Sequence, residues 1–207
     1  MALSYPLPFP TITGVRTQRV TPEANVAVSE APFDFTEQTQ VHQGERWVFE
    51  FSAAFGKRVT HAIWVGFLVG LNGRQGTFTV GDKDAQTALG SASSSPGTPV
   101  IDGASQTGKT LNIDGVPSGA SNYLKIGDYI QLANNRLHII TANGSADSAG
   151  NIALEIWPSL RESPSDGATV IVDSTVGIFR LANNRPTWSI NTAGIYTVNF
   201  IAVEAVE

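Results

Sequence analysis

The amino-acid composition of this chain changes abruptly along its length, which limits how it can be divided into domains. All ten Phe residues lie outside residues 81–175, whereas eight of the nine Asp residues lie inside that stretch. The same stretch carries five Lys or Arg against ten Asp or Glu, so it holds the whole net charge of −5. Because each domain builds its own core, we predict an outer domain made of residues 1–81 plus 176–207. Residues 82–175 are predicted to be an inserted small β-barrel domain.

Two stretches of the outer part have the pattern of β-strands. Residues 45–51 alternate in polarity and place Trp47, Phe49 and Phe51 on one face. Residues 194–203 are rich in β-branched and aromatic side chains, which predicts a strand buried on both faces.

One helix is predicted between these strands, at about residues 59–71. Thr60 is a candidate N-cap, and Asn72-Gly73 can end the helix. An apolar stripe wide enough to lie on a sheet runs along it, formed by Ile63, Trp64, Phe67, Leu68 and Leu71. The outer domain is therefore expected to be a β-sandwich-like unit with one helix, and the whole chain to be mainly β.

The middle part is punctuated by turn dipeptides at intervals of about 8–12 residues, a spacing typical of small barrels and sandwiches. These are Asp102-Gly103, Asp114-Gly115, Gly127-Asp128, Asn134-Asn135, Asn143-Gly144 and Asp166-Gly167. The segments between them read as short strands, at 111–113, 129–132, 137–140, 152–157 and 169–172. Residues 85–99, rich in Ser, Gly and Pro, are expected to form an exposed entry loop.

Residues 103–110 match the phosphate-binding pattern G-x-x-x-x-G-K-[ST] letter for letter. A phosphate-binding loop needs a helix directly after it, because the amides of the helix N-terminus hold the phosphate. Here the sequence Leu-Asn-Ile-Asp-Gly follows, which predicts a strand and a turn. We therefore expect no nucleotide binding, and we expect Lys109→Ala to leave stability and assembly unchanged.

No set of residues with the spacing of a catalytic or metal site is apparent. The chain has no Cys, and His42, His61 and His138 fall in separate predicted elements. Residues 147–151 lack the alternating acidic series of a calcium loop. We expect no enzyme activity, no metal and no cofactor.

Charge and hydropathy limit the partners. A net charge of −5 argues against nucleic-acid binding, which needs a basic face. The longest apolar run, residues 62–71, is too short to cross a bilayer. Only 15% of residues are charged, against about 25% in ordinary globular domains, which suits a surface that packs against other proteins.

Several segments, in this order, resemble the distal tail or minor tail proteins of long-tailed phages and prophages. They are residues 67–82 (FLVGLNGRQGTFTVGD), 100–115 (VIDGASQTGKTLNIDG), 124–132 (LKIGDYIQL), 156–161 (IWPSLR) and 177–181 (GIFRL). Together they span most of residues 60–200, whereas the first 58 residues match nothing.

The resemblance implies a structural virion protein at the tail tip, made in the cytoplasm of the bacterial host. Proteins of this family form a six-fold ring from a β-domain with one helix, often with peripheral barrels. The expected partners are further copies of the chain, the tail tube protein and the tip or hub proteins that engage the host. The proline-rich residues 1–12 are expected to lie across a neighbouring subunit.

The alternative is a carbohydrate-binding module for host attachment. Sugar binding uses exposed aromatic rings beside polar groups, and the middle part offers Tyr123, Tyr129 and Trp157. Burial of these rings in a barrel core is the competing interpretation, and their exposure distinguishes the two.

Overall fold

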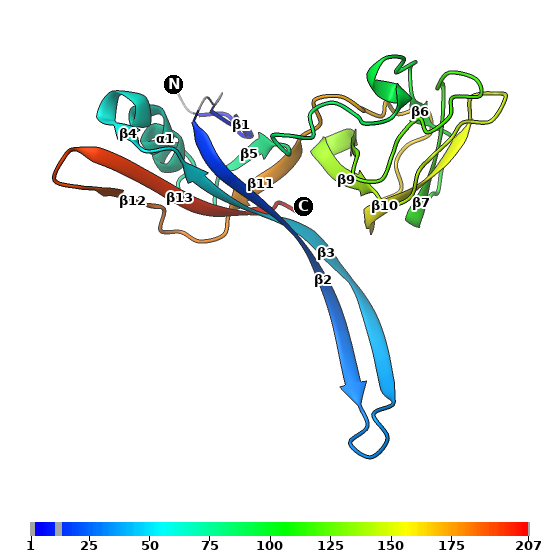
Figure 1. Ribbon diagram of the computed structural model, residues 1–207, viewed down its shortest axis with the longest axis horizontal. Coiled ribbons are helices and arrows are strands. Elements are labelled where there is room, and N and C mark those ends of the chain that lie inside the picture. The colour runs from blue at the N-terminus through cyan, green and yellow to red at the C-terminus, as the bar shows by residue number, and fades with distance from the viewer. Residues whose placement is uncertain (1–2, 11–13, 207) are drawn as a thin grey trace.

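The computed structural model describes residues 3–10 and 14–206. It confirms a mainly β chain with one α-helix among the described residues, with 45% of residues in strands and 9% helical. The strands form two sheets (Figure 1). The larger sheet has eight strands, and the smaller has five and curls into a half-barrel.

The larger sheet has the strand order β1-β5-β11-β13-β3-β2, with β12 and β4 also paired to β13. Only β1 and β5 are parallel; the other pairs are antiparallel. Its strands are β1 (Leu7–Pro8), β2 (Val15–Glu30), β3 (Glu37–Ala53), β4 (Gly56–Lys57), β5 (Thr77–Val80), β11 (Gly177–Leu181), β12 (Thr187–Ile190) and β13 (Ile195–Glu204).

One face of this sheet carries an aromatic core. In register, Phe51 lies opposite Phe200 and Phe78 lies opposite Phe179, so large rings meet across neighbouring strands. Phe9 packs over them, with its ring centroid 4.8 Å from that of Phe51. Such cross-strand aromatic pairs are favourable beyond the area that they bury.

The alternation predicted for residues 45–51 is confirmed, because Trp47, Phe49 and Phe51 are all buried. The prediction for residues 194–203 is wrong in one respect. Val198, Phe200 and Ala202 are buried, but Ile201 between them is 42% exposed. β13 therefore has one buried face and one accessible face.

The helix α1 (Arg58–Gly70) lies over the aromatic face, within about a residue of its predicted bounds. It ends as predicted, since Asn72 and Gly73 both have positive φ. Thr60 is not its N-cap: Lys57 holds that position without a side-chain hydrogen bond. Ile63 is also not part of the buried stripe, because 56% of it is exposed.

The smaller sheet has the order β6-β7-β10-β9-β8. It comprises β6 (Val100–Ile101), β7 (Gly108–Asp114), β8 (Tyr129–Leu132), β9 (Arg136–Ile140) and β10 (Ile152–Leu160), with short 3₁₀ turns at Ser91–Ser93 and Ala133–Asn135. The predicted strand at 169–172 is reduced to two isolated bridges, Thr169 with Val100 and Ile171 with Gln131.

Most of the predicted turns are confirmed by positive φ, including Asn134 and the glycines of the Asp-Gly pairs. Gly144 is an exception and instead bridges to Leu124. The segment 85–99 is not simply an exposed loop. The backbone amides of Leu89 and Gly90 donate to the buried carboxylate of Asp128, at 2.7 and 3.2 Å, and these bonds hold the segment against the half-barrel.

The described part of the proline-rich arm also differs from expectation. Leu7 pairs with Phe78, Tyr5 Oη donates to the Gly70 carbonyl at 2.7 Å, and Phe9 joins the core. Residues 3–10 therefore pack on their own subunit, while residues 1–2 and 11–12 of the arm lie outside the described residues.

Buried side chains form two clusters. One cluster is built from residues 47–80 and 179–202, and the other from residues 92–172. Tyr129 and Leu137 belong to the first cluster although they come from the middle part. The two connecting segments meet closely, since a Cβ on Gly81 would lie 2.0 Å from the Thr175 carbonyl oxygen.

This closeness lets a short Gly/Ser linker replace residues 84–174, and we expect the remaining outer part to fold. Its free energy of unfolding should be lower than that of the full chain, because Trp47 would lose the contacts of Leu137 and Trp157. A cooperative thermal transition followed by circular dichroism checks this. Loss of any cooperative transition would show that the two clusters form one folding unit.

Candidate assembly surfaces

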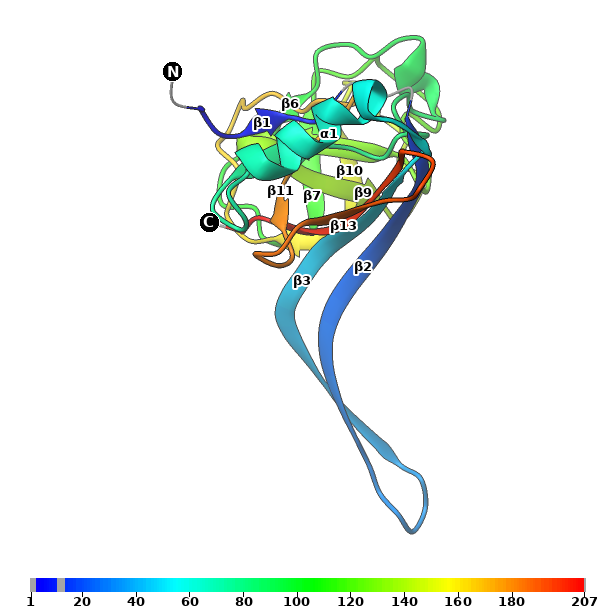
Figure 2. The ribbon, with the colours of Figure 1, turned by 90° about the vertical axis from the view of Figure 1, so that its left-hand side faces the viewer.

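The most distinctive surface is the β2–β3 hairpin, which projects far beyond the body (Figures 1 and 2). Its proximal half belongs to the large sheet, and its distal half is paired only with itself, from Val26 opposite Val41 to Glu30 opposite Glu37. The register shifts between Ala24 and Val26, where the two halves meet. Such irregularities bend a ribbon and increase its twist.

The distal half of the hairpin exposes large apolar side chains. Phe33 is 96% and Phe35 74% exposed at the tip, and three further exposed side chains lie along the strands, Val26, Val28 and Val41. A two-stranded ribbon with no core is marginally stable in water. Apolar groups gathered on such a projection are typical of a surface that packs against another protein.

A second apolar surface lies on the outer side of α1. Val59 is 91% exposed, and Ile63 and Val69 are each more than half exposed. Val59 and Ile63, four residues apart, lie above one another on the side of the helix away from the buried Trp64 and Leu68. A helix that is apolar on both sides is usually covered on both sides.

The two parts of the chain are joined by buried ionic contacts beside the base of the hairpin. The Arg161 guanidinium donates to both carboxylate oxygens of Glu204, each at 3.1 Å, and also to the Glu45 carbonyl. Glu204 in turn accepts from the Trp47 amide at 3.1 Å. Arg161 comes from the middle part and Glu204 from the outer part, so these contacts fix one part against the other.

The carboxylate of Glu45 is the second anchor of this joint. It accepts from the Ser159 amide at 2.7 Å and pairs with the Lys109 ammonium at 2.7 Å. Burial by itself would raise the pKa of Glu45, but these contacts outweigh it and hold the pKa below its ordinary value. The side chain is therefore charged at neutral pH.

This joint overturns one expectation from the sequence. Lys109 does not lie in a free loop: it is in β7 and pairs with the buried Glu45. Lys109→Ala should therefore lower the free energy of unfolding, by about 1–3 kcal/mol, since it leaves a buried carboxylate with one partner fewer. Urea unfolding of the variant measures this loss, and Lys125→Ala, an exposed lysine of the same part, is the matched control.

Residues 103–110 have no phosphate-binding geometry. The strand predicted at 111–113 is confirmed, but it belongs to a longer strand, β7, which already starts at Gly108, and no helix directly follows. The expectation that the protein does not bind ATP or GTP stays a prediction, which titration calorimetry of the full chain tests.

The three aromatic side chains proposed for sugar contact lie in or against the core. Tyr123 is fully buried, its hydroxyl donates to the Pro96 carbonyl at 2.6 Å, and burial raises its pKa to about 12. Tyr129 is buried as well, and burial raises its pKa. Trp157 is half-buried, with its ring edge-to-face on Trp47 at 4.5 Å. Tyr123 and Tyr129 therefore offer no exposed ring face for stacking on a sugar.

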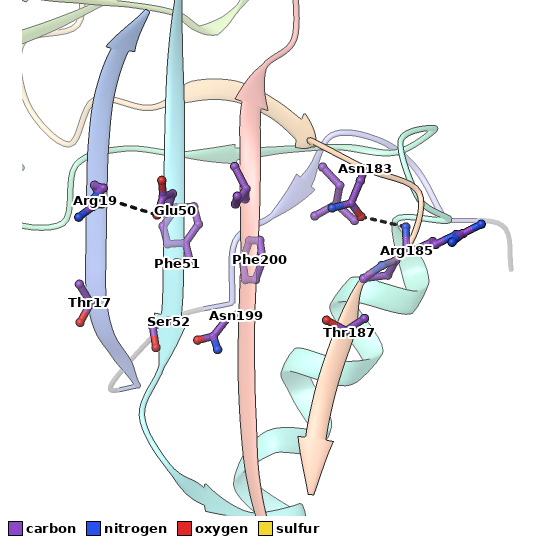
Figure 3. A pocket seen from close by; sticks show the side chains of 13 residues that line it. Thr17, Arg19, Glu50, Phe51, Ser52, Asn183, Arg185, Thr187, Asn199 and Phe200 are labelled. Carbon is purple, nitrogen blue, oxygen red and sulfur yellow. Dashed lines mark hydrogen bonds and ion pairs between the residues drawn. The ribbon is translucent and has the colours of Figure 1, made fainter.

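The accessible face of the large sheet is hollowed into an open groove of about 580 Å³. Figure 3 shows Thr17, Arg19, Glu50, Ser52 and Asn199 on three adjacent strands, with Arg185 at the far side. Arg19 pairs with Glu50 at 3.7 Å. The lining residues include hydroxyl groups but no histidine to activate them, so the groove has no nucleophile–base pair of the usual kind.

The histidines lie apart. His42 is exposed on the hairpin, His61 is a buried residue of α1, and His138 is buried in β9. Among residues 3–10 and 14–206, no group of three or more His, Asp and Glu side chains could hold a metal ion. Over the same residues, no helix is long and apolar enough to cross a bilayer.

Burial of His138 predicts a pH effect on stability. Burial, with Arg161 and Arg136 nearby, lowers its pKa from 6.5 to about 4, against the opposing effect of the Pro158 carbonyl, which lies 2.7 Å from Nδ1. In the unfolded chain His138 therefore takes up a proton near pH 6.5, whereas in the folded chain it stays neutral until the pH falls to about 4. Stability is full above pH 6.5 and falls as the pH drops toward about 4, by up to about 3 kcal/mol.

Urea unfolding at several pH values between these limits measures how steeply the free energy of unfolding depends on pH. His138→Asn keeps a donor near the Pro158 carbonyl but does not titrate, so its stability should vary less over this range. An equal slope in the variant and the parent would contradict the assignment to His138.

The hairpin was not predicted from the sequence, although its distal half carries the most exposed aromatic ring of the described residues. An unburied ribbon needs no alternation of apolar and polar residues, so periodicity could not reveal it. The available signal was local: the Ala31-Pro-Phe-Asp-Phe-Thr36 turn is flanked by two β-prone runs. Pro22 within the first run is tolerated because β2 is an edge strand.

No family model matches the chain, and no curated protein matches it.

Proposed function

We propose that this protein is a structural component of the tail tip of a long-tailed bacteriophage, where copies form a closed ring between the tail tube and the tip proteins. The proposal starts from the ordered resemblance of residues 67–181 to distal tail proteins. The mainly β chain with one helix and a barrel-like middle part is compatible with the architecture that this resemblance implies.

One observation of the structure carries the proposal. A 16-residue strand and a 17-residue strand form a hairpin whose distal half buries almost nothing in its own subunit, yet ends in two exposed phenylalanines. Such a projection adds little to the stability of an isolated subunit, because it buries little apolar surface there. An assembly gains from it, because the hairpin can reach a neighbour and bury its apolar side chains there.

Labelling of phage particles tests the proposal. Antibodies against the protein should decorate the distal end of the tail in electron micrographs, and particles made without the protein should lack a functional tip. Labelling of the capsid, or infectious particles with normal tails in the absence of the protein, would refute it.

A further inference from the structure

The hairpin tip is acidic as well as apolar. Residues 24–44 contain Glu30, Asp34 and Glu37 and no Lys or Arg, so this segment carries a charge of −3 with histidine neutral. All of these residues except Ala31 are exposed. We call residues 24–44 the acidic tip.

The region around α1 has the complementary character. Residues 51–81 contain Lys57, Arg58 and Arg74 and no Asp or Glu, a charge of +3 with histidine neutral. Lys57 and Arg58 are exposed beside Val59, and neither has an acidic partner among the described residues. Nearby, the Arg16 guanidinium lies over the exposed ring of Phe55, 5.0 Å from its centroid. We call this surface the basic helix face; its apolar centre is Val59, Ala62, Ile63 and Val69.

One subunit cannot bring these two surfaces together. The acidic tip lies at the far end of the hairpin, and α1 lies on the opposite side of the body (Figure 1). The distal strands are paired with one another and extend at about 3.3 Å per residue, which carries the tip away from its own helix. The partner of each surface must therefore come from another molecule.

We propose that the acidic tip of one copy of this chain docks on the basic helix face of the next copy. Both surfaces carry exposed apolar side chains that contact would bury, and their charges are of opposite sign. Because the two surfaces differ and lie apart on the subunit, the contact is head-to-tail, and repetition of it closes a ring or extends a filament. This inference rests on the ring proposed above and names its contact.

Cross-linking tests the contact directly, because the chain has no cysteine. The double variant Thr36→Cys and Ala62→Cys places one thiol on the acidic tip and one on the basic helix face, both at exposed positions. The full chain is used at about 1 mM, a protein concentration at which even a contact with a dissociation constant of about 1 mM is populated. Treatment with a short bismaleimide should then give a ladder of dimers, trimers and larger species. Each single variant should stay largely uncross-linked.

Two outcomes of this experiment would overturn the inference. Dimers of the Thr36→Cys single variant would show tip-to-tip pairing, and absence of a ladder from the double variant would show that these surfaces do not meet in copies of this chain. In the latter case another protein is the partner of the hairpin.

A charge exchange supplies an independent readout. Glu30→Lys with Glu37→Lys should weaken association at least about tenfold, because attractions become repulsions. Lys57→Glu with Arg58→Glu should do the same, and combining all four changes should restore association. Glu162→Lys with Lys125→Glu, exposed residues of the middle part, is the matched control and should have no effect. No rescue in the combined variant, measured by sedimentation, would contradict the pairing.

The two proposals can fail separately. Tip labelling of phage particles combined with no ladder leaves the tail-tip function standing and removes this contact. A ladder with charge rescue, but no label at the tail tip, establishes the contact in a different assembly.

Discussion

Replacing residues 25–44 by the dipeptide Asn-Gly is expected to abolish assembly while the body of the protein still folds. Ala24 and Glu45 lie directly opposite each other in register, so a two-residue turn can join them. The removed residues contribute to neither buried cluster. The thermal midpoint followed by circular dichroism should therefore change little, whereas association and complementation of a phage lacking the protein should be lost.

A variant that keeps the hairpin separates apolar contact from mere length. Phe33→Ser with Phe35→Ser removes the two most exposed aromatic rings of the tip. Burial of such side chains is worth about 1.5–3 kcal/mol each before the costs of association, so the double variant should assemble at least about a hundredfold more weakly. Val206→Ser, an exposed apolar residue away from the tip, is the control. Normal assembly of either hairpin variant would remove the hairpin from the contact.

Arg161→Ala is expected to destabilise the folded chain by about 3–5 kcal/mol, because it leaves the buried carboxylate of Glu204 without its cationic partner. The Glu45 carbonyl loses a donor in the same variant. Arg161→Lys keeps the charge but lacks the planar fork that donates in parallel to both oxygens of Glu204, so it should destabilise the chain less than Arg161→Ala does. Urea unfolding of the parent chain and the two variants gives their order of stability.

The exposed pair of Arg19 and Glu50 provides a matched control. These charges are 3.7 Å apart, with 71% and 43% of their side chains exposed, and such pairs contribute less than about 1 kcal/mol. Arg19→Ala should therefore be nearly neutral. Equal losses in Arg161→Ala and Arg19→Ala would show that the joint does not hold the two parts together.

Acid should weaken the other anchor of the same joint. The pKa of Glu45 in the folded chain is lower than its ordinary value of 4.5. The contribution of its ionic contacts to the free energy of unfolding is therefore complete above pH 4.5, and it is lost as the pH falls through the lower pKa of the folded chain. Lys109→Ala should reduce this acid sensitivity, because it removes the ammonium that lowers the pKa.

The local elements of the outer core and most turns of the middle part could be predicted from the sequence alone. Trp47, Phe49 and Phe51 alternate because one face of β3 is buried, and buried faces leave a period of two in the sequence. Asn72-Gly73 ends α1 because both residues tolerate positive φ. The strand-like run at 111–113 correctly predicted that no helix follows the phosphate-binding pattern at 103–110, although the strand already begins at Gly108.

Contacts between residues far apart in the chain could not be predicted and became apparent only from the folded structure. Lys109 and Glu45 are 64 positions apart and Arg161 and Glu204 are 43 apart, and charged residues carry no mark of their eventual partner. The exposed faces of β13 and α1 were misjudged because apolar side chains such as Ile201 and Ile63 look the same in sequence whether buried or exposed. The hairpin was not predicted because its distal half has no buried face. Its distal half is shaped by pairing between its own two strands, and without a buried face it lacks the periodicity from which strands are recognised.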